Sequence, residues 1–320
     1  MPPFFTRVAW LFCLLISSAH AAPYGPLLEA PELTSALNTH ASLTLLDIRS
    51  SEDYQAGHIN GALSAPYAQW RGPADNPGKL AEVAYFEQLL QKLGITQHDA
   101  IVVYSSGSDQ TDFGAAARVY WTLKYLGLTQ LSILNGGYEY WQRTQAASAL
   151  SSAPVNNPPS SNIKVKPQHQ WVIFKEELLN KITQQDSQYQ LLDARPEAFF
   201  NGEVKAPTAS TPGTIATAKS LPFAQWFNQQ DNRIRPVSEI KALVGAQGLN
   251  KAAETVSFCN TGHWAATNWF VLSELAKLPQ VRLYPASLAE WTQDSTLLPM
   301  DNTPSRLQQI KTKFSTLVNE

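Results

Sequence analysis

The chain contains an internal repeat, and this repeat constrains the fold more than any other feature of the sequence. Five matches between the two halves keep the same order, at offsets of about 150 residues. They pair residues 45–49 with 191–195, 66–70 with 222–226, Gly94 with Gly248, 103–105 with 257–259, and Trp141 with Trp291. Because chance matches would not stay in order, the pattern predicts two copies of one domain that differ in loop length.

Composition indicates where these domains begin and end. The chain has 320 residues, of which 44% are hydrophobic and 16% charged, and this suits two globular domains. Residues 146–167 are rich in proline, serine and asparagine, so we expect an exposed linker there. The sequence therefore predicts a first domain at residues 22–145, a second at residues 168–300 and a C-terminal tail at residues 301–320.

Short apolar runs alternate with helical patterns in each half. The expected strands are residues 43–46, 100–104, 132–134, 189–192, 255–258 and 281–284, and the expected helices are residues 83–93, 113–126, 238–247 and 265–277. This alternation predicts an α/β fold in which each domain has a parallel sheet flanked by helices on both faces. Ligands of such sheets gather at the carboxyl ends of the strands.

Residues 1–21 have the layout of a secretory signal peptide. Arg7 precedes an apolar run at residues 8–16, and small residues follow it. An uncleaved anchor is the alternative, but this run is too short to span a hydrocarbon core of about 30 Å. We expect cleavage after Ala21, a periplasmic or secreted mature protein, and no membrane insertion after cleavage.

Charge and cysteine content narrow the class of function. The formal net charge is −2 and the basic residues are scattered, so no nucleic-acid partner is expected. The chain has two cysteines, Cys13 and Cys259, and cleavage would remove Cys13. The mature protein would then carry one thiol in an oxidising compartment, without a partner for an internal disulfide. Cys259 is therefore either an inert core residue or a residue kept for its reactivity.

The sequence around Cys259 favours reactivity. A strand at residues 255–258 precedes the cysteine and a helix from residue 265 follows, so residues 259–264 (Cys-Asn-Thr-Gly-His-Trp) form a six-residue turn. Such a turn directs backbone N–H groups at its centre, and the helix N-terminus adds a partial positive charge. Both effects favour the thiolate form of Cys259. Gly262 suits a position in this turn that needs positive φ.

Three further motifs accompany this turn. They are residues 47–49 (Asp-Ile-Arg), residues 57–62 (Gly-His-Ile-Asn-Gly-Ala) and residues 135–141 (Asn-Gly-Gly-Tyr-Glu-Tyr-Trp). Together with the turn they resemble the motifs of the tandem-domain rhodaneses, or thiosulfate and 3-mercaptopyruvate sulfurtransferases, over roughly residues 28–298. The resemblance implies two rhodanese-like domains. It also implies that the first domain is inactive, since Ser105 stands at the cysteine position, and that the second is catalytic.

The resemblance implies roles for residues of the second domain. Cys259 is expected to be the nucleophile and persulfide carrier. Arg195 is expected to be the cation that fixes an anionic donor, with Asp193 as its structural support, and Lys205 and Lys219 are weaker candidates for a cation. The other residues expected at the substrate are Asn260, Thr261, Gly262, His263 and Trp264.

Several positions depart from the family's pattern. Asn260 stands where members that use thiosulfate usually have Arg, residues 213–215 (Gly-Thr-Ile) replace Gly-His-Ile, and residues 285–287 (Pro-Ala-Ser) replace the glycine turn. His263 is either a charged group of the site or a hydrogen-bonded loop residue without a chemical role. Trp264 either shields the sulfur or packs against the helix. These departures leave the identity of the sulfur donor open, and they affect the expected transfer reaction less.

The implied reaction is a double displacement. The Cys259 thiolate takes the outer sulfur of a small anionic donor such as thiosulfate, and a thiol, cyanide or a protein acceptor then takes it from the persulfide. No metal or cofactor is expected, because Cys259 has no clustered His or carboxylate ligands.

The sequence is also compared with three other functions, two of which stay open. The neutral residues 260–262 favour 3-mercaptopyruvate as the donor. The sequence offers no obvious second arginine, however, to bind the carboxylate of this donor. A persulfide carrier or sensing module that binds a partner protein is the non-enzymatic alternative. A cysteine phosphatase is set aside, since Ala265 stands where a phosphate-binding Arg would be needed.

Overall fold

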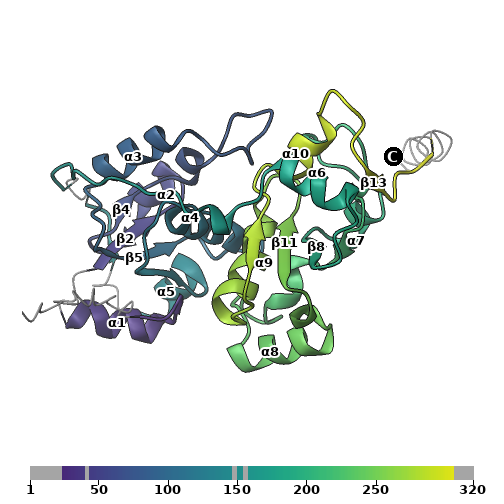
Figure 1. Cartoon of the computed structure of the whole chain (residues 1–320). Helices are drawn as coiled ribbons and strands as arrows, with labels where there is room; N and C mark the ends of the chain where they lie inside the picture. The colour runs from purple at the N-terminus through teal and green to yellow at the C-terminus, as the bar shows by residue number, and fades with distance from the viewer. Residues whose placement is uncertain (1–23, 40–42, 146–149, 154–157, 306–320) are drawn as a thin grey trace, which may run out of the picture.

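The computed structural model describes residues 24–39, 43–145, 150–153 and 158–305 as two α/β domains that lie side by side (Figure 1). The predicted signal peptide, residues 1–21, lies outside the described residues. Within these ranges, no helix is long and apolar enough to cross a lipid bilayer.

The first domain is built on a parallel sheet with the strand order β1-β6-β5-β2-β4. The strands are β1 (Leu27–Leu28), β2 (Leu43–Asp47), β4 (Leu63–Ser64), β5 (Ala100–Tyr104) and β6 (Leu131–Leu134). The helices are α1 (Ala30–Asn38), α2 (Ser51–Ala56), η1 (Tyr67–Trp70), α3 (Val83–Lys92), α4 (Phe113–Tyr125) and α5 (Gly137–Thr144). A short antiparallel pair, β3 (His58–Ile59) and β7 (Leu150–Ser151), completes the domain.

The second domain has a parallel sheet with the order β10-β8-β11-β12. The strands are β8 (Tyr189–Asp193), β10 (Lys219–Ser220), β11 (Glu254–Phe258) and β12 (Val281–Leu283), and β9 (Thr214–Ile215) pairs antiparallel with β13 (Met300–Asp301). The helices are η3 (His169–Trp171), α6 (Lys175–Thr183), α7 (Glu197–Phe200), η4 (Phe223–Trp226), α8 (Val237–Ala246), η5 (Leu249–Lys251), α9 (Trp264–Phe270) and α10 (Ser287–Thr292). The order of its four strands matches β4-β2-β5-β6, so the predicted α/β fold is confirmed in both halves.

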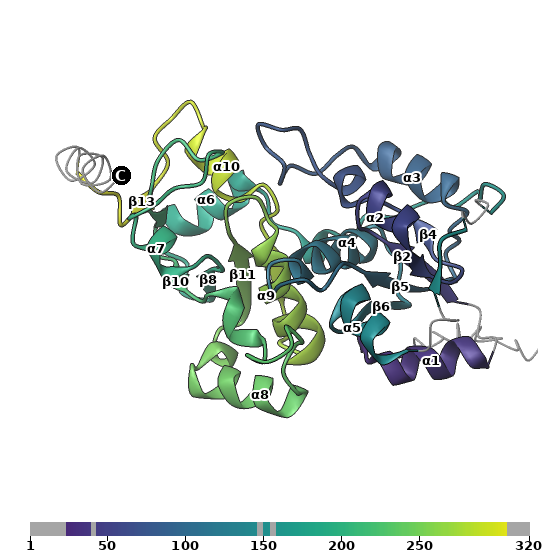
Figure 2. The same cartoon turned by 180° about the vertical axis from the view of Figure 1, so that it is seen from behind.

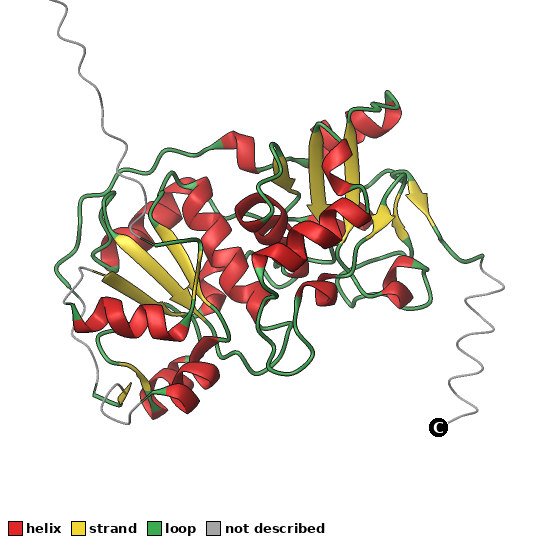
Figure 3. Ribbon diagram, turned by 90° about the horizontal axis from the view of Figure 1, so that it is seen from below, coloured by secondary structure: helices red, strands yellow, loops and turns green. Residues whose placement is uncertain are grey.

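Helices cover both faces of each sheet (Figures 2 and 3). Side chains alternate between the two faces along a strand. Leu46 and Val103 therefore reach the core beneath α3 and α4, whereas Leu45 and Val102 reach the separate core beneath α1 and α5. Burial on both faces explains why these strands are apolar throughout rather than alternating with polar residues.

One apolar core continues from the first domain into the second. Helix α4 packs against α9 between the two sheets, and Phe113 and Tyr120 of α4 meet Phe270 of α9 edge to face, with ring centroids 5.6 and 5.0 Å apart. Trp70 and Trp226, which match each other in the repeat, are both buried in this core. On one face of each sheet, the two domains thus share a single apolar core.

Two segments differ from what the sequence predicts. The helix expected at residues 265–277 is an α-helix only to Phe270, and a π-helical turn at Val271–Leu275 follows it. The predicted linker is not wholly exposed, because Ile163 is buried in the shared core and its carbonyl accepts a hydrogen bond from the Gln91 side chain (3.0 Å). Val165 packs against the same core, the Ser161 N–H donates to the Gln91 carbonyl (3.0 Å), and Leu150–Ser151 forms strand β7, so several contacts hold this segment against the first domain.

The π-helical turn carries a charged group to the interface. Glu274 is 5% exposed, and its carboxylate accepts hydrogen bonds from the Tyr120 hydroxyl (2.9 Å) and from Lys124 Nζ (2.8 Å) of helix α4. The Lys124 ammonium also lies 4.8 Å from the centre of the Trp171 ring. The Lys124 side chain is 23% exposed, so the pair is largely removed from water and each charge needs the other.

Replacing Glu274 by Ala removes the counter-charge of Lys124, and we expect the free energy of unfolding to fall by about 3 kcal/mol. Lys164→Ala is the matched control, since Lys164 pairs with Glu87 at the surface and its side chain is 77% exposed. That variant should lose less than about 1 kcal/mol. Urea unfolding followed by tryptophan fluorescence measures both variants, and equal losses would contradict a role for Glu274 in holding the two domains together.

Candidate active site

Cys259 lies directly after β11, at the carboxyl edge of the second sheet. β11 is an inner strand, between β8 and β12, and its last residue Phe258 is level with Asp193 of β8. Helix α9 begins at Trp264, so residues 259–264 form the loop expected from the sequence (hereafter the cysteine loop). Cys259 is 1% exposed.

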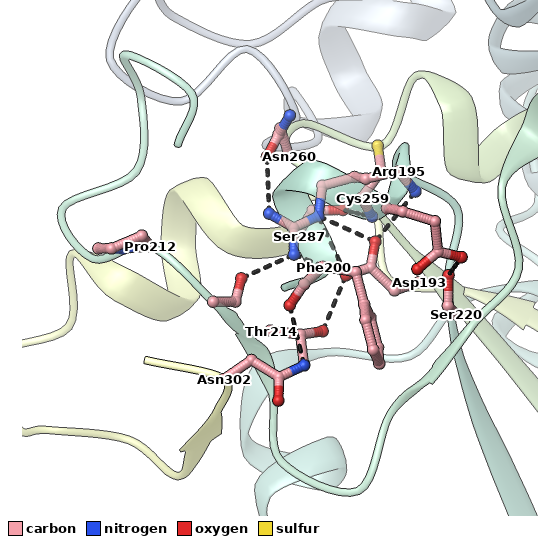
Figure 4. Close-up of polar contacts among 12 residues, drawn as sticks. Asp193, Arg195, Phe200, Pro212, Thr214, Ser220, Cys259, Asn260, Ser287 and Asn302 are labelled. Atoms are coloured by element: carbon pink, nitrogen blue, oxygen red, sulfur yellow. Dashed lines mark hydrogen bonds and ion pairs between the residues drawn. The ribbon is translucent and has the colours of Figure 1, made fainter. Parts of the chain in front are cut away.

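Ser287 holds the backbone of Cys259. The Cys259 N–H donates to Ser287 Oγ (3.1 Å; Figure 4). The Ser287 hydroxyl donates to the Tyr284 carbonyl (2.8 Å). Ser287 has a backbone φ of +54°, a value that residues other than glycine rarely adopt. The corresponding residue of the first domain is Gly137, which has a φ of +60°. Sequence reasoning noted the departure from the glycine turn at residues 285–287 but did not assign Ser287 a role.

The cysteine loop contains a run of unpaired backbone donors. Among the described residues, no acceptor receives a hydrogen bond from the backbone N–H groups of residues 260–265. The carbonyls of Cys259 and Asn260, by contrast, accept from the N–H groups of Leu288 and Ala289 (3.1 and 2.9 Å). Consecutive free N–H groups form a concavity that binds anions.

Arg195 lies beneath the loop and is already paired. Its guanidinium donates to both carboxylate oxygens of Asp193 (2.6 to 3.0 Å) and to the Gly213 carbonyl (2.7 Å), and Nη1 donates to Asn260 Oδ1 (3.3 Å). Thr214 also donates to Asp193 (2.8 Å). Figure 4 shows this network, whose two charged residues are no more than 1% exposed. Asp193 therefore supports Arg195, and donor binding by Arg195 stays a prediction.

The first domain contains the same arrangement. Arg49 donates to the carboxylate of Asp47 (2.5 to 3.2 Å) and to the Gly57 carbonyl (2.7 Å). Since this half has no cysteine at the loop, the Asp-x-Arg pair supports the repeated fold in both copies. Of the weaker cation candidates, Lys205 donates to the Ala209 carbonyl (2.9 Å) and Lys219 is exposed on β10.

Two arginines of the first domain reach the cysteine loop. Arg71 Nη2 donates to the Thr261 carbonyl (3.0 Å). Arg118 Nη1 donates to the Gly262 carbonyl (3.3 Å), and its Nη2 donates to the Gly78 carbonyl (2.8 Å). Sequence reasoning missed both arginines, because nothing in their local sequence indicates contact with the other half.

His263 is held by the first domain through both ring nitrogens. Nε2 donates to the Thr111 carbonyl (2.8 Å), so Nδ1 accepts from the Tyr67 hydroxyl (2.9 Å), which in turn accepts from Arg71 (3.0 Å). Burial lowers the pKa of His263 to about 4, and the Arg71 guanidinium acts in the same direction. The ring is therefore neutral at pH 7, and the backbone of Gly114 approaches it too closely for any side chain at that position.

Trp264 lies among aromatic side chains. Its ring stacks on Phe223 with centroids 5.1 Å apart and meets Phe199 edge to face at 6.0 Å. Its indole N–H is buried and has no acceptor among the described residues. These contacts are those of a packing residue at the start of α9.

The corresponding loop of the first domain carries its own anion. The carboxylate of Asp112 accepts from the Gly107 N–H (2.6 Å) and bonds the Ser105 side chain. Burial raises the pKa of Asp112, and these two hydrogen bonds oppose that shift. A carboxylate of the chain itself thus receives one backbone donor of this loop, the Gly107 N–H, whereas no carboxylate receives a backbone donor of the cysteine loop in the described structure.

No three His, Cys, Asp or Glu side chains gather into a metal-binding group within the described ranges. Residues that could hold a metal are therefore not found beside Cys259 in this part of the chain.

Comparison with known proteins places both halves in one family. The model of the rhodanese-like domain matches residues 29–144 and residues 174–294. "Putative thiosulfate sulfurtransferase 1" of Mycobacterium bovis is 29% identical over 272 residues, covering 82% of this chain and 92% of that protein. A Synechococcus elongatus protein named "Putative thiosulfate sulfurtransferase" is 27% identical over 300 residues, covering 87% and 86% of the two chains.

Solved structures show the same fold at lower identity. The 3-mercaptopyruvate sulfotransferase SseA of Escherichia coli superposes with a TM-score of 0.70 at 22% identity, covering 82% of this chain and 99% of that chain. The anaerobic ergothioneine biosynthesis enzyme of Chlorobium limicola superposes with a TM-score of 0.73 at 21% identity, covering 87% and 71%. At these identities the likeness is one of fold.

The pKa of His263 predicts a pH dependence of stability. Unfolded histidine binds a proton near pH 6.5, but folded His263 does so only near pH 4, so acid favours the unfolded chain between these values. The stability contribution of neutral His263 is full above about pH 6.5 and is lost as the pH falls toward 4. We expect His263→Gln, which keeps an N–H donor for Thr111, to weaken this dependence.

Urea unfolding at pH 7 and pH 5 measures the difference, with His98→Gln at an exposed histidine as the control. If His263→Gln lost as much stability on acidification as the unmodified chain does, the neutral ring would have no part in it.

Proposed function

Since the chain belongs to the rhodanese family and carries two tandem copies of its domain, we propose that its second domain moves a sulfane sulfur from thiosulfate to a thiol or cyanide through a persulfide on Cys259. The chain is a sulfurtransferase of the rhodanese type, as its similarity to proteins named for that activity indicates. The donor and the persulfide are the further steps of the proposal.

The observation that carries the proposal is the contrast between the two corresponding loops. In the first domain, Ser105 replaces the cysteine and Asp112 supplies an anion to the loop. In the second domain the loop holds Cys259 and leaves its donors without a protein acceptor. A thiolate or persulfide sulfur is an anion that these N–H groups can stabilise at each stage of the transfer.

The first half-reaction loads the cysteine. The Cys259 thiolate attacks the outer sulfur of thiosulfate and forms a new sulfur–sulfur bond. The bond between that outer sulfur and the sulfite sulfur breaks, and its electron pair leaves with sulfite. The negative charge that began on Cys259 then lies on the terminal sulfur of the persulfide.

The second half-reaction unloads it. Cyanide or a thiolate attacks the terminal sulfur, and the electron pair of the breaking sulfur–sulfur bond returns to Cys259 as the thiolate. Thiocyanate or a persulfide of the acceptor thiol leaves. Splitting the transfer in two lets the same loop stabilise the negative charge in both steps.

The loop residues have distinct parts in this proposal. Ser287 fixes the Cys259 N–H, and Arg195 holds the side chain of Asn260. Gly262 has a φ of +68°, and a side chain there would meet the Pro285 carbonyl and Arg118. Only glycine can make this turn, and the turn is what leaves its neighbours' N–H groups free.

The location of the enzyme is a separate proposal. The layout of residues 1–21 supports export and cleavage after Ala21. In that compartment, small anionic donors and thiols, or a protein acceptor, would be the partners of Cys259.

The persulfide can be detected directly. We expect full-length protein treated with thiosulfate to gain the mass of one sulfur atom on Cys259, and to lose it with release of thiocyanate when cyanide is added. Cys259→Ser should show neither the adduct nor turnover, while Ser105→Ala, at the matching position of the first domain, should keep both. Intact-protein mass spectrometry and thiocyanate assay measure these outcomes. Full activity in Cys259→Ser would refute the assignment of the site.

The donor can be tested by comparing thiosulfate with 3-mercaptopyruvate. Arg195 is paired with Asp193, and Arg71 and Arg118 each bond a carbonyl of the loop rather than standing among its free N–H groups, so the loop offers no second cation for the carboxylate of a keto acid. We therefore expect kcat/KM to be at least about tenfold higher with thiosulfate. The reverse order would assign the enzyme to 3-mercaptopyruvate, and turnover with neither donor would favour a persulfide carrier.

A further inference from the structure

Arg118 is a buried cation without a counter-anion in the described structure. Its side chain is fully buried, and its hydrogen-bond acceptors are two backbone carbonyls, those of Gly262 and Gly78. Its Nε–H is buried with no acceptor in the described residues, and its guanidinium lies 5.2 Å from the centre of the Trp121 ring. Burying an unpaired charge costs several kcal/mol. Such a position is stable when an anion lies close by.

The acidic groups near Arg118 are few. Burial, together with the neighbouring Arg71, lowers the pKa of Arg118 to about 9, whereas Tyr67 and Cys259 act in the opposite direction. At neutral pH the guanidinium is still charged. The Tyr67 hydroxyl is neutral there, because burial raises its pKa. Cys259 is therefore the group near Arg118 that can supply a negative charge at working pH.

The two first-domain arginines also determine how the loop peptides are oriented. A trans peptide is planar, so the carbonyl of one residue and the N–H of the next point in opposite directions. Arg71 holds the Thr261 carbonyl, and this turns the N–H of Gly262 away from the first domain. Arg118 holds the Gly262 carbonyl, and this turns the N–H of His263 away in the same manner. Both N–H groups belong to the free donors of the loop.

We infer that Arg71 and Arg118 of the catalytically silent first domain are positioning residues for the sulfur site of the second. They orient the N–H groups of Gly262 and His263 toward the bound sulfur, and Arg118 is the fixed positive charge that balances the Cys259 thiolate and persulfide. The inference rests on the proposed function, and it gives the first domain a part in the active site.

The arginines supply a charge that the cysteine loop itself lacks. Asn260 follows the cysteine, His263 is neutral, and the charge of Arg195 is balanced by Asp193. Arg118 and Arg71 of the first domain supply this positive charge, and they contact the carbonyl side of the loop peptides, opposite the N–H groups. It strengthens the N–H donors of the loop and leaves them free for the sulfur.

The test measures the ionisation of Cys259 in the full chain without any sulfur donor. The rate of alkylation by iodoacetamide is followed as a function of pH, because only the thiolate reacts. Cys259→Ser provides the background from Cys13. In the described part of the chain, the charged or titratable groups around the loop are Tyr67, Arg71, Asp109 and Arg118 from the first domain and Asp193, Arg195 and His263 from the second.

We expect Arg118→Gln to move the midpoint of the alkylation profile to higher pH by about one unit or more, and Arg71→Gln to move it in the same direction by less. Arg118→Lys keeps the charge and should leave the midpoint close to that of the unmodified chain. Arg233→Gln is the matched control, since Arg233 also crosses between the domains but pairs with Glu29 and Asp231. It should not shift the profile.

Each outcome decides one question. Unshifted profiles in folded Arg118→Gln and Arg71→Gln would overturn the inference, even if the enzyme forms its persulfide. If Arg118→Gln fails to fold, Arg71→Gln decides: a profile shifted to higher pH supports the inference and an unshifted one overturns it. Absence of a persulfide in the unmodified chain would refute the proposed function, and the alkylation profiles would still measure what the two arginines do.

Discussion

Helix α4 of the first domain and helix α9 of the second bury their apolar faces against each other, and the geometry of the site depends on this contact. The cysteine loop ends where α9 begins, so the packing of α9 places the loop against the first domain. Helix α4 carries Gly114 and Arg118 on the side that faces the loop. Any sliding of the two helices would separate these residues from the loop and expose the aromatic rings between them.

The two copies share the Asp–Arg pair that supports the loop, but they differ in the side chains of the loop itself. Asp47 with Arg49 and Asp193 with Arg195 make the same contacts, so the support beneath the loop is part of the repeated fold. The loops above these supports differ in where the negative charge comes from. In one copy a carboxylate of the chain supplies it, and in the other a sulfur atom is proposed to do so. The proposed difference in activity between the two domains thus lies in a few side chains at one sheet edge.

The sequence predicted the parts of the structure that local pattern encodes. The apolar runs predicted β2, β5, β8 and β11 within a residue or two, and the strand, turn and helix around Cys259 predicted the cysteine loop. Periodicity indicates that a face is buried but not which element covers it, so Arg71 and Arg118 had no visible link to the second domain. The π-helical turn that carries Glu274 follows a regular helical pattern and is set by the interface. The contact of Arg195 with the Asn260 side chain likewise depends on the three-dimensional arrangement of the loop above β8.

A copy of a duplicated domain that does not carry the proposed reactive residue is ordinarily free to change in sequence. Here the close approach of Gly78 to Thr261 and Pro285, and of Gly114 to His263, removes that freedom, because a side chain at either position would collide with the other copy. The proposed activity of the second copy therefore constrains backbone positions of the first. Deleting the first copy would uncover the loop rather than release a smaller enzyme.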